Sequence, residues 1–147
     1  MGIIIDKKKT IIILIIGIIS GSLSTINAII SDIEKKNLNI KNQLVELTNA
    51  ANKELPKMID SETRYDSVIV LGNKTLQFNY TIINYSKDEL DINELRDDFY
   101  SRILDNIKMN FNQKSLKDNK IKMIYIINDK DDHKIIELVF DRNVYGK

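Results

Sequence analysis

Three carboxylates near the middle of the chain have a spacing that could support acid–base chemistry. Asp60, Glu62 and Asp66 follow one another closely, and Arg64 stands among them. Two carboxyl groups held a suitable distance apart can hydrolyse a glycosidic bond, one as the acid and the other as base or nucleophile. On an edge strand the same side chains would form surface ion pairs instead. We take the ion pairs as the main interpretation and keep a small envelope hydrolase as an alternative.

A second group of potential ligands lies near the C-terminus, in the stretch formed by Asn128, Asp129, Asp131, Asp132 and His133. A calcium loop needs alternating oxygen ligands, a glycine at its sharp turn and a distant glutamate. This stretch has no glycine, and a lysine interrupts its acids. The chain has one histidine, so a zinc site or a nucleophile–base pair would depend on His133. We interpret the stretch as a solvated hairpin tip, and predict no metal, no cofactor and no catalytic residue.

The composition narrows the classes of partner. The chain has 147 residues, 22 basic and 21 acidic side chains and no cysteine. Residues 1–30 hold three lysines and one aspartate, which leaves 19 basic and 20 acidic residues in the remainder. This balance does not favour nucleic acid as a partner. Without cysteine there are no disulfides, no thiolate metal sites and no lipoprotein anchor.

The N-terminal segment has the pattern of an export signal or a membrane anchor. Lys7, Lys8 and Lys9 precede an apolar stretch over residues 10–30. A helix of that length would be roughly 30 Å long, which matches a bilayer core. We therefore predict a cytoplasmic flank at 1–9 and a transmembrane anchor or signal sequence at 10–30, with the rest outside the cytoplasm. Small residues at 20–22 leave cleavage open, so the location is either single-pass in the inner membrane or secreted and periplasmic.

The remainder divides into an amphipathic helix over 31–55 and an α+β domain over 56–147. The helix is predicted from a 3.6-residue apolar stripe at Ile33, Ile40, Leu44, Leu47, Ala51 and Leu55. Pro56 ends it. Two pairs of strands follow, at 62–71 with 75–83 and at 121–127 with 135–140, and a helix from 91 to about 110 separates them.

Strand pairs joined by short turns are antiparallel. The predicted fold class is therefore α+β. After an N-terminal transmembrane or signal helix comes a two-layer sandwich of helices on a four-stranded antiparallel sheet, in the order α-β-β-α-β-β. Alternation in the second strand places Leu76, Phe78, Tyr80 and Ile82 on one face and Gln77, Asn79 and Thr81 on the other. Two capping signatures, Ser86 with Glu89 and Asp91 with Glu94, compete for the start of the second helix.

The segment from Leu55 to Ser67, read with Phe78 to Thr81, resembles a small group of exported bacterial proteins of unknown function. In that group an LP-x-x-(I/V)-D-x-x-T segment precedes a hairpin that ends in Y-x-Y-T. Here Phe78 replaces the first tyrosine, and a cysteine frequent in the group is missing. The resemblance covers roughly residues 47–100. It implies an exported α+β domain and no known activity.

The layout is also similar to that of type IV pilins, which join an apolar N-terminal helix to an antiparallel sheet. Pilins carry a glycine just before the apolar run and a glutamate five residues into it. At these places the chain has Lys9-Thr10 and Leu14-Ile15. A pilin-like structural subunit therefore stays an alternative.

These observations predict a non-enzymatic bacterial domain, membrane-anchored or secreted, that binds another component of the envelope. Its partners would be the membrane, through residues 10–30, and an unknown envelope protein. The candidate interaction surface consists of Asp60, Thr63, Arg64 and Asp66. Alternatively, Asp60 and Thr63 cap backbone groups where the chain passes from the helix to the hairpin.

Overall fold

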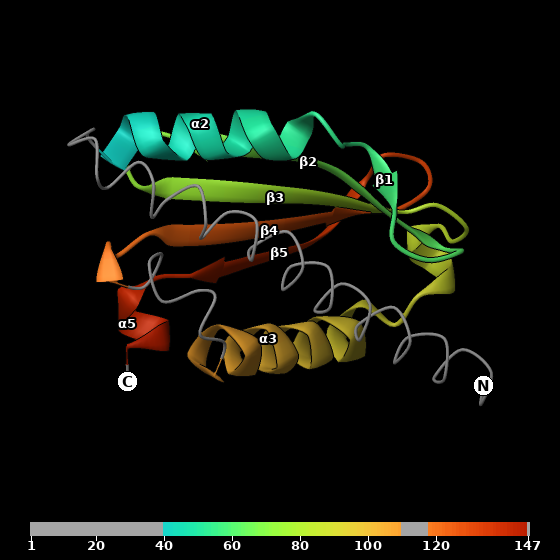
Figure 1. Ribbon diagram of the computed structural model, residues 1–147. Helices are drawn as coiled ribbons and strands as arrows, with labels where there is room; N and C mark the ends of the chain where they lie inside the picture. Colours follow the sequence, from blue (N-terminus) through green and yellow to red (C-terminus); the bar gives the residue numbers. More distant parts are fainter. Residues whose placement is uncertain (1–39, 110–117, 147) are drawn as a thin grey trace.

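The computed structural model describes residues 40–109 and 118–146 (Figure 1). The predicted flank at 1–9, the predicted anchor or signal at 10–30 and the beginning of the amphipathic helix lie outside these residues. The pilin alternative requires a single helix over residues 10–55; residues 10–39 of it lie outside the described ranges, and the described helix that begins at Ile40 ends at Asn52. Within the described ranges, no helix combines the length and apolar character needed to cross a bilayer.

The described residues form one five-stranded sheet, in the order β1-β2-β3-β4-β5, with helices beside it. The elements are α2 (Ile40–Asn52), β1 (Lys57–Met58), β2 (Thr63–Leu71), β3 (Thr75–Ile82), the 3₁₀ helix η1 (Lys87–Glu89), α3 (Ile92–Met109), β4 (Lys122–Asn128), β5 (Lys134–Phe140) and α5 (Arg142–Tyr145). The four predicted strands and the predicted helix at 91–110 agree with these bounds within one or two residues. The predicted α+β class is thus confirmed.

The number and direction of the strands differ from the prediction. The sheet has five strands, and it is mixed, because β3 and β4 are parallel, with Thr75 opposite Lys122 and Thr81 opposite Asn128. The connection that contains α3 returns the chain to the end of the sheet at which β3 begins. Strand β4 therefore runs in the same direction as β3. Hairpin signals predict how each pair forms but not how two pairs join. The extra strand, β1, is two residues long, too short to show a pattern.

The two long helices share a single apolar core with one face of the sheet. Leu47 of α2 and Phe99 of α3 belong to the same buried cluster as Phe78 and Tyr125 of the central strands. In Figure 1, α2 lies along β2, toward one edge of the sheet, and α3 lies beside β5, at the other edge. In β3 the predicted alternation is confirmed, since the four apolar residues from Leu76 to Ile82 are buried.

Aromatic rings fill the centre of this core. Tyr65 stacks on Tyr80 with ring centroids 4.6 Å apart, and Phe78 stacks on Tyr125 at 4.9 Å. The edge of Tyr125 also meets Phe140, at 5.6 Å. Offset stacks and edge contacts of this kind add to the stabilisation that burial provides. Burial also raises the pKa values of Tyr80 and Tyr125, whose hydroxyls have no hydrogen-bond partner among the described residues.

Both predicted capping signatures are used, one after the other. The Glu89 carboxylate accepts hydrogen bonds from the backbone N–H of Ser86, at 2.7 Å, and from the Ser86 hydroxyl, at 3.0 Å. These bonds cap the N-terminal end of η1. Asp91 then accepts from the backbone N–H of Glu94 at 3.2 Å, at the start of α3. The apparent competition in the sequence therefore reflects two short helical starts in succession.

Candidate functional site

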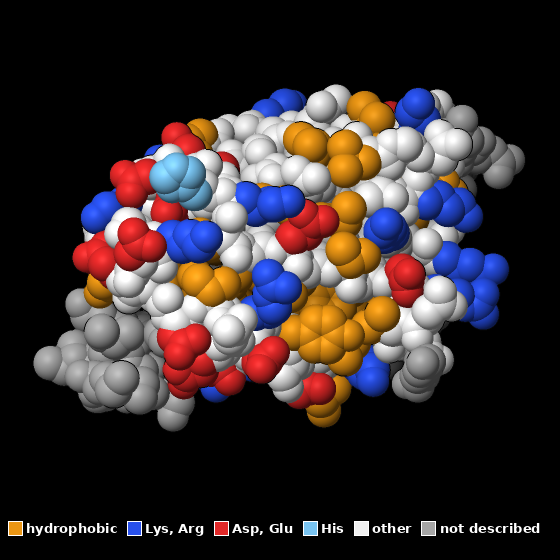
Figure 2. Space-filling view, turned by 180° about the vertical axis from the view of Figure 1, so that it is seen from behind, with side chains coloured by type: hydrophobic (Ala, Val, Ile, Leu, Met, Phe, Trp, Pro, Cys, Tyr) orange, Lys and Arg blue, Asp and Glu red, His pale blue; other side chains and the backbone are white. Residues whose placement is uncertain are grey.

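The sheet face turned away from the core carries a polar row next to partly exposed apolar side chains. We call it the open face. Strand register places Arg64 opposite Thr81 and Ser67 opposite Asn79 on this face. Its apolar members include Ile69 and Leu71, which are 39% and 38% exposed, together with the half-buried Ile124, Ile126 and Val139. Figure 2 shows the molecule from the side opposite Figure 1, where hydrophobic side chains alternate with charged ones.

Three polar side chains on the open face form a connected chain. The Nε of Arg64 donates to Oδ1 of Asp66, and the hydroxyl of Thr81 donates to Oδ2 of the same carboxylate at 2.6 Å. The β2–β3 register shifts between Tyr65 and Ser67, so Asp66 is the extra residue of a β-bulge. A bulge redirects a side chain relative to regular alternation. It brings Asp66 to the same face as Arg64 and Thr81.

The amides farther along the row are bonded to one another. Gln77 donates to the Oδ1 of Asn79 at 2.8 Å, and Asn79 donates through Nδ2 to the hydroxyl of Ser67 at 3.0 Å. On β5, the acidic residue of this face, Glu137, forms an ion pair with Lys134. The row is therefore ordered by internal hydrogen bonds and ion pairs, and Arg64 is one of its basic groups.

The structure separates the four residues that the sequence predicted as a surface. Arg64 and Asp66 lie together on the open face, but Thr63 is fully buried on the core side, opposite Ile82. The Oδ1 of Asp60 accepts from the backbone N–H groups of Glu62, at 2.6 Å, and Thr63, at 2.7 Å. These contacts are those of an Asx-type turn leading into β2. They match the capping role left open for Asp60, whereas its role in an interaction surface stays a prediction.

The three carboxylates considered for hydrolysis have separate partners. Asp60 caps the turn, Asp66 is bonded to Arg64 and Thr81, and Oε1 of Glu62 accepts from the hydroxyl of Tyr85 at 3.4 Å. A hydrolytic pair needs two carboxyl groups that face one bound substrate. Among the described residues, these three carboxylates therefore have different hydrogen-bond partners.

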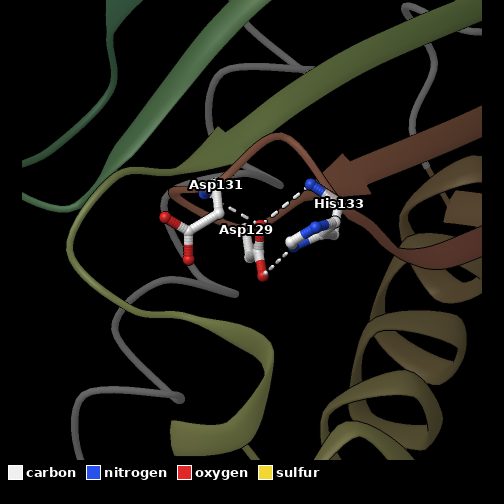
Figure 3. A group of neighbouring side chains, drawn as sticks. All are labelled: Asp129, Asp131 and His133. Carbon is white, nitrogen blue, oxygen red and sulfur yellow. Dashed lines mark hydrogen bonds and ion pairs between the residues drawn. The ribbon is translucent and has the colours of Figure 1, made fainter.

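The loop between β4 and β5 differs from a solvated tip in one residue (Figure 3). Asp131 and His133 are exposed as predicted, but Asp129 is fully buried. Its Oδ1 accepts from the backbone N–H groups of Asp131 and His133, both at 2.9 Å, and its Oδ2 accepts from the N–H of Lys87 at 2.9 Å. Burial raises the pKa of this carboxyl, but the hydrogen bonds from His133, Lys87 and Asp131 outweigh it and lower the pKa to about 2.

Asp129, Asp131 and His133 offer ligand atoms within 4.8 Å of one another, close enough to surround a metal ion. However, His133 Nδ1 lies 3.4 Å from the second oxygen of Asp129, so four groups already contact this carboxylate. A carboxylate has about four acceptor positions, and a metal would have to displace these contacts. The hydrogen bonds of the Asp129 carboxylate thus join the β4–β5 loop to Lys87 of η1. We call this arrangement the clamp at Asp129.

Sequence alternation already placed Thr81 and Asn79 on the polar face of β3, and this signal could have identified them as site residues. No comparable pattern in the sequence indicates the bulge that brings Asp66 beside Thr81. Nor does any pattern indicate the contact between Asp129 and Lys87, since it joins segments far apart in the chain.

A family model described as "Domain of unknown function (DUF8479)" matches residues 39–137. This agrees with the resemblance to a family without known activity. No curated protein matches the chain.

Three solved structures share the fold. One is a candidate secreted protein from Pseudomonas aeruginosa, with a TM-score of 0.60 and 14% identity, over 72% of this chain and 92% of that one. Another is a pilotin of the type 2 secretion system from Vibrio vulnificus, with a TM-score of 0.56 and 10% identity, over 72% and 91%. The third is a type II secretion system pilotin from Vibrio cholerae, with a TM-score of 0.51 and 12% identity, over 76% and 97%. At such identities the likeness establishes the fold alone.

Proposed function

The chain belongs to the DUF8479 family, and from this premise we propose that its domain is a non-enzymatic protein-binding domain of the bacterial envelope. The binding surface in this proposal is the open face, and the partner is another envelope protein. The domain works outside the cytoplasm, either held at the membrane by the predicted segment 10–30 or released after cleavage.

The observation that carries the proposal is the exposure of apolar side chains beside an ordered polar row. Ile69 and Leu71 are each more than one-third exposed, on the same face as Arg64 and Asp66. Protein–protein interfaces combine an apolar centre with hydrogen-bonding groups already held in position. The described helices pack on the other face, so they leave this surface accessible (Figure 2).

The fold likeness supports the same proposal. Two of the similar structures are named as pilotins of a type 2 secretion system, and a third as a candidate secreted protein. Their names connect this fold to bacterial secretion. A role in contacting an envelope protein fits that connection and requires no catalytic group.

Site-specific photo-crosslinking in living cells tests the surface. A photoreactive amino acid would replace Ile69 on the open face and, as a matched control, Met109, which is 83% exposed on α3. We expect a discrete product with an envelope protein from Ile69 and not from Met109. The proposal fails if Ile69 gives no product, or if the control position gives the same one.

A further inference from the structure

We propose that Arg64 is a carboxylate-binding point, which recognises an acidic side chain or a terminal carboxylate of a protein partner. This inference rests on the proposed function and specifies the chemistry that the open face recognises. It follows from the way the guanidinium is held.

One N–H group of the Arg64 guanidinium is hydrogen-bonded within the domain, and its other N–H groups remain for a ligand. Nε is bonded to Asp66, and in the described part of the chain neither terminal nitrogen has a partner. The side chain is 40% exposed. A guanidinium is planar, so fixing Nε also fixes the plane and leaves the pair of terminal nitrogens as a fork. That fork matches the two oxygens of a carboxylate.

The carboxylate that orients Arg64 is itself held on both sides. Thr81 is 4% exposed, and its hydroxyl bonds the second oxygen of Asp66 at 2.6 Å. An ordinary surface ion pair consists of two mobile side chains and contributes little. Here Thr81 restrains Asp66, and Asp66 restrains Arg64. Such pre-organisation lowers the entropy lost when a ligand binds.

The surroundings favour a carboxylate carried on a partly apolar segment. Ile69 and Leu71 follow Arg64 along the same face of β2. At about 3.3 Å per residue, Ile69 lies on the order of 15 Å from Arg64, which is about two to three turns of a helix laid along the strand. A partner segment with an acidic residue at one end and apolar residues farther along would contact both places.

An anion titration of the full-length protein tests the binding point directly. Sodium acetate is the carboxylate probe, with sodium chloride at equal ionic strength as the reference. The NMR signal of the Arg64 Nε–H group, identified by its loss in Arg64→Gln, reports binding. We expect a saturable shift with acetate only, and about 10-fold weaker binding in Thr81→Val. Thr81→Ser keeps the hydroxyl and should bind acetate like the wild type.

Two results would overturn the inference at this stage. Acetate and chloride could produce equal, non-saturating shifts, or Thr81→Val could bind acetate as tightly as the wild type. Should Thr81→Val fail to fold, Thr81→Ala removes the same hydroxyl and leaves the Asp66 carboxylate in place. It should weaken acetate binding to a similar extent, and unchanged binding would count against the inference equally.

The partner is tested by combining Arg64→Gln with the photoreactive residue at position 69. We expect about a 10-fold lower yield of the crosslinked product, with partial recovery in Arg64→Lys. A full yield in Arg64→Gln would disprove carboxylate recognition while the protein-binding function stood. No product in the wild type would disprove the function itself, and the acetate titration would then decide on Arg64 alone.

Discussion

The side-chain amide of Asn52, near the end of α2, makes both hydrogen bonds that a neighbouring strand would make to Val68. Its Nδ2 donates to the Val68 carbonyl at 2.7 Å, and its Oδ1 accepts from the Val68 N–H at 2.9 Å. Strand β1 pairs with β2 only at Tyr65 and Arg64, so beyond this point the edge of β2 needs another partner. Unpaired edges invite association with other strands. Asn52 takes the place of a neighbouring strand at Val68 with one side chain.

Replacing Asn52 should therefore destabilise the domain more than its position near a helix end implies. Asn52→Ala leaves a partly buried N–H and C=O without partners, which costs about 1–3 kcal/mol in the free energy of unfolding. Asn52→Asp should cost more, because a carboxylate oxygen would face the Val68 carbonyl. Urea denaturation measures both, with the exposed Lys53→Ala as control. If Asn52→Asp proved as stable as this control, the two hydrogen bonds would contribute nothing.

Two buried tyrosines provide a matched pair for the effect of hydroxyl groups. The Tyr145 hydroxyl donates to the carbonyl of Ile121 at 2.9 Å, whereas the Tyr125 hydroxyl is buried without a partner among the described residues. We expect Tyr145→Phe to lower the free energy of unfolding by about 1 kcal/mol. Tyr125→Phe removes an unsatisfied group and should be neutral or stabilising. Equal losses in the two variants would indicate that the Tyr125 hydroxyl is hydrogen-bonded after all, as by a buried water.

The clamp at Asp129 should make stability depend on acid pH. The pKa of this carboxyl is lowered from 3.8 to about 2 in the folded protein, against the effect of burial, by backbone N–H groups. A group with a lowered folded pKa contributes fully above its unfolded pKa, and the contribution disappears as the pH falls through the folded one. Stability should therefore decrease between about pH 4 and pH 2.

Thermal unfolding of wild type and Asp129→Asn across that range checks this expectation. The asparagine cannot accept from Lys87 through its NH₂ group, so the variant should be less stable at pH 7 and lose less between pH 4 and pH 2. Asp132→Asn is the control, because Asp132 is exposed with a φ of 62°, a conformation that asparagine tolerates. Parallel acid transitions in wild type and Asp129→Asn would refute the clamp.

Much of the fold could be predicted because its signals are local. Apolar spacing marked α3 and the inward face of β3, and the Gly72 turn marked the first hairpin, where Gly72 adopts a φ of 63°. The parallel β3–β4 pair could not be predicted, since it joins residues far apart in the chain. The Asp66 bulge and the burial of Asp129 depend on the same kind of distant contact. For the candidate site, the sequence predicted Arg64 and Asp66 but not Thr81, whose hydroxyl bonds Asp66. A binding role for Arg64 and Asp66 stays a proposal.

The parallel contact between β3 and β4 also has a consequence for the order of folding. Each antiparallel hairpin closes a short loop, whereas β3 meets β4 only after the whole connection containing α3 has been closed. Contacts between distant residues carry a larger entropic cost and slow the folding reaction. We expect the two hairpins to form first and to dock late, along the middle of the sheet. Folding and unfolding rates of conservative variants of Phe78 and Tyr125 test this order. The φ-values of these variants should be close to zero, because the native contacts between the hairpins would form after the transition state.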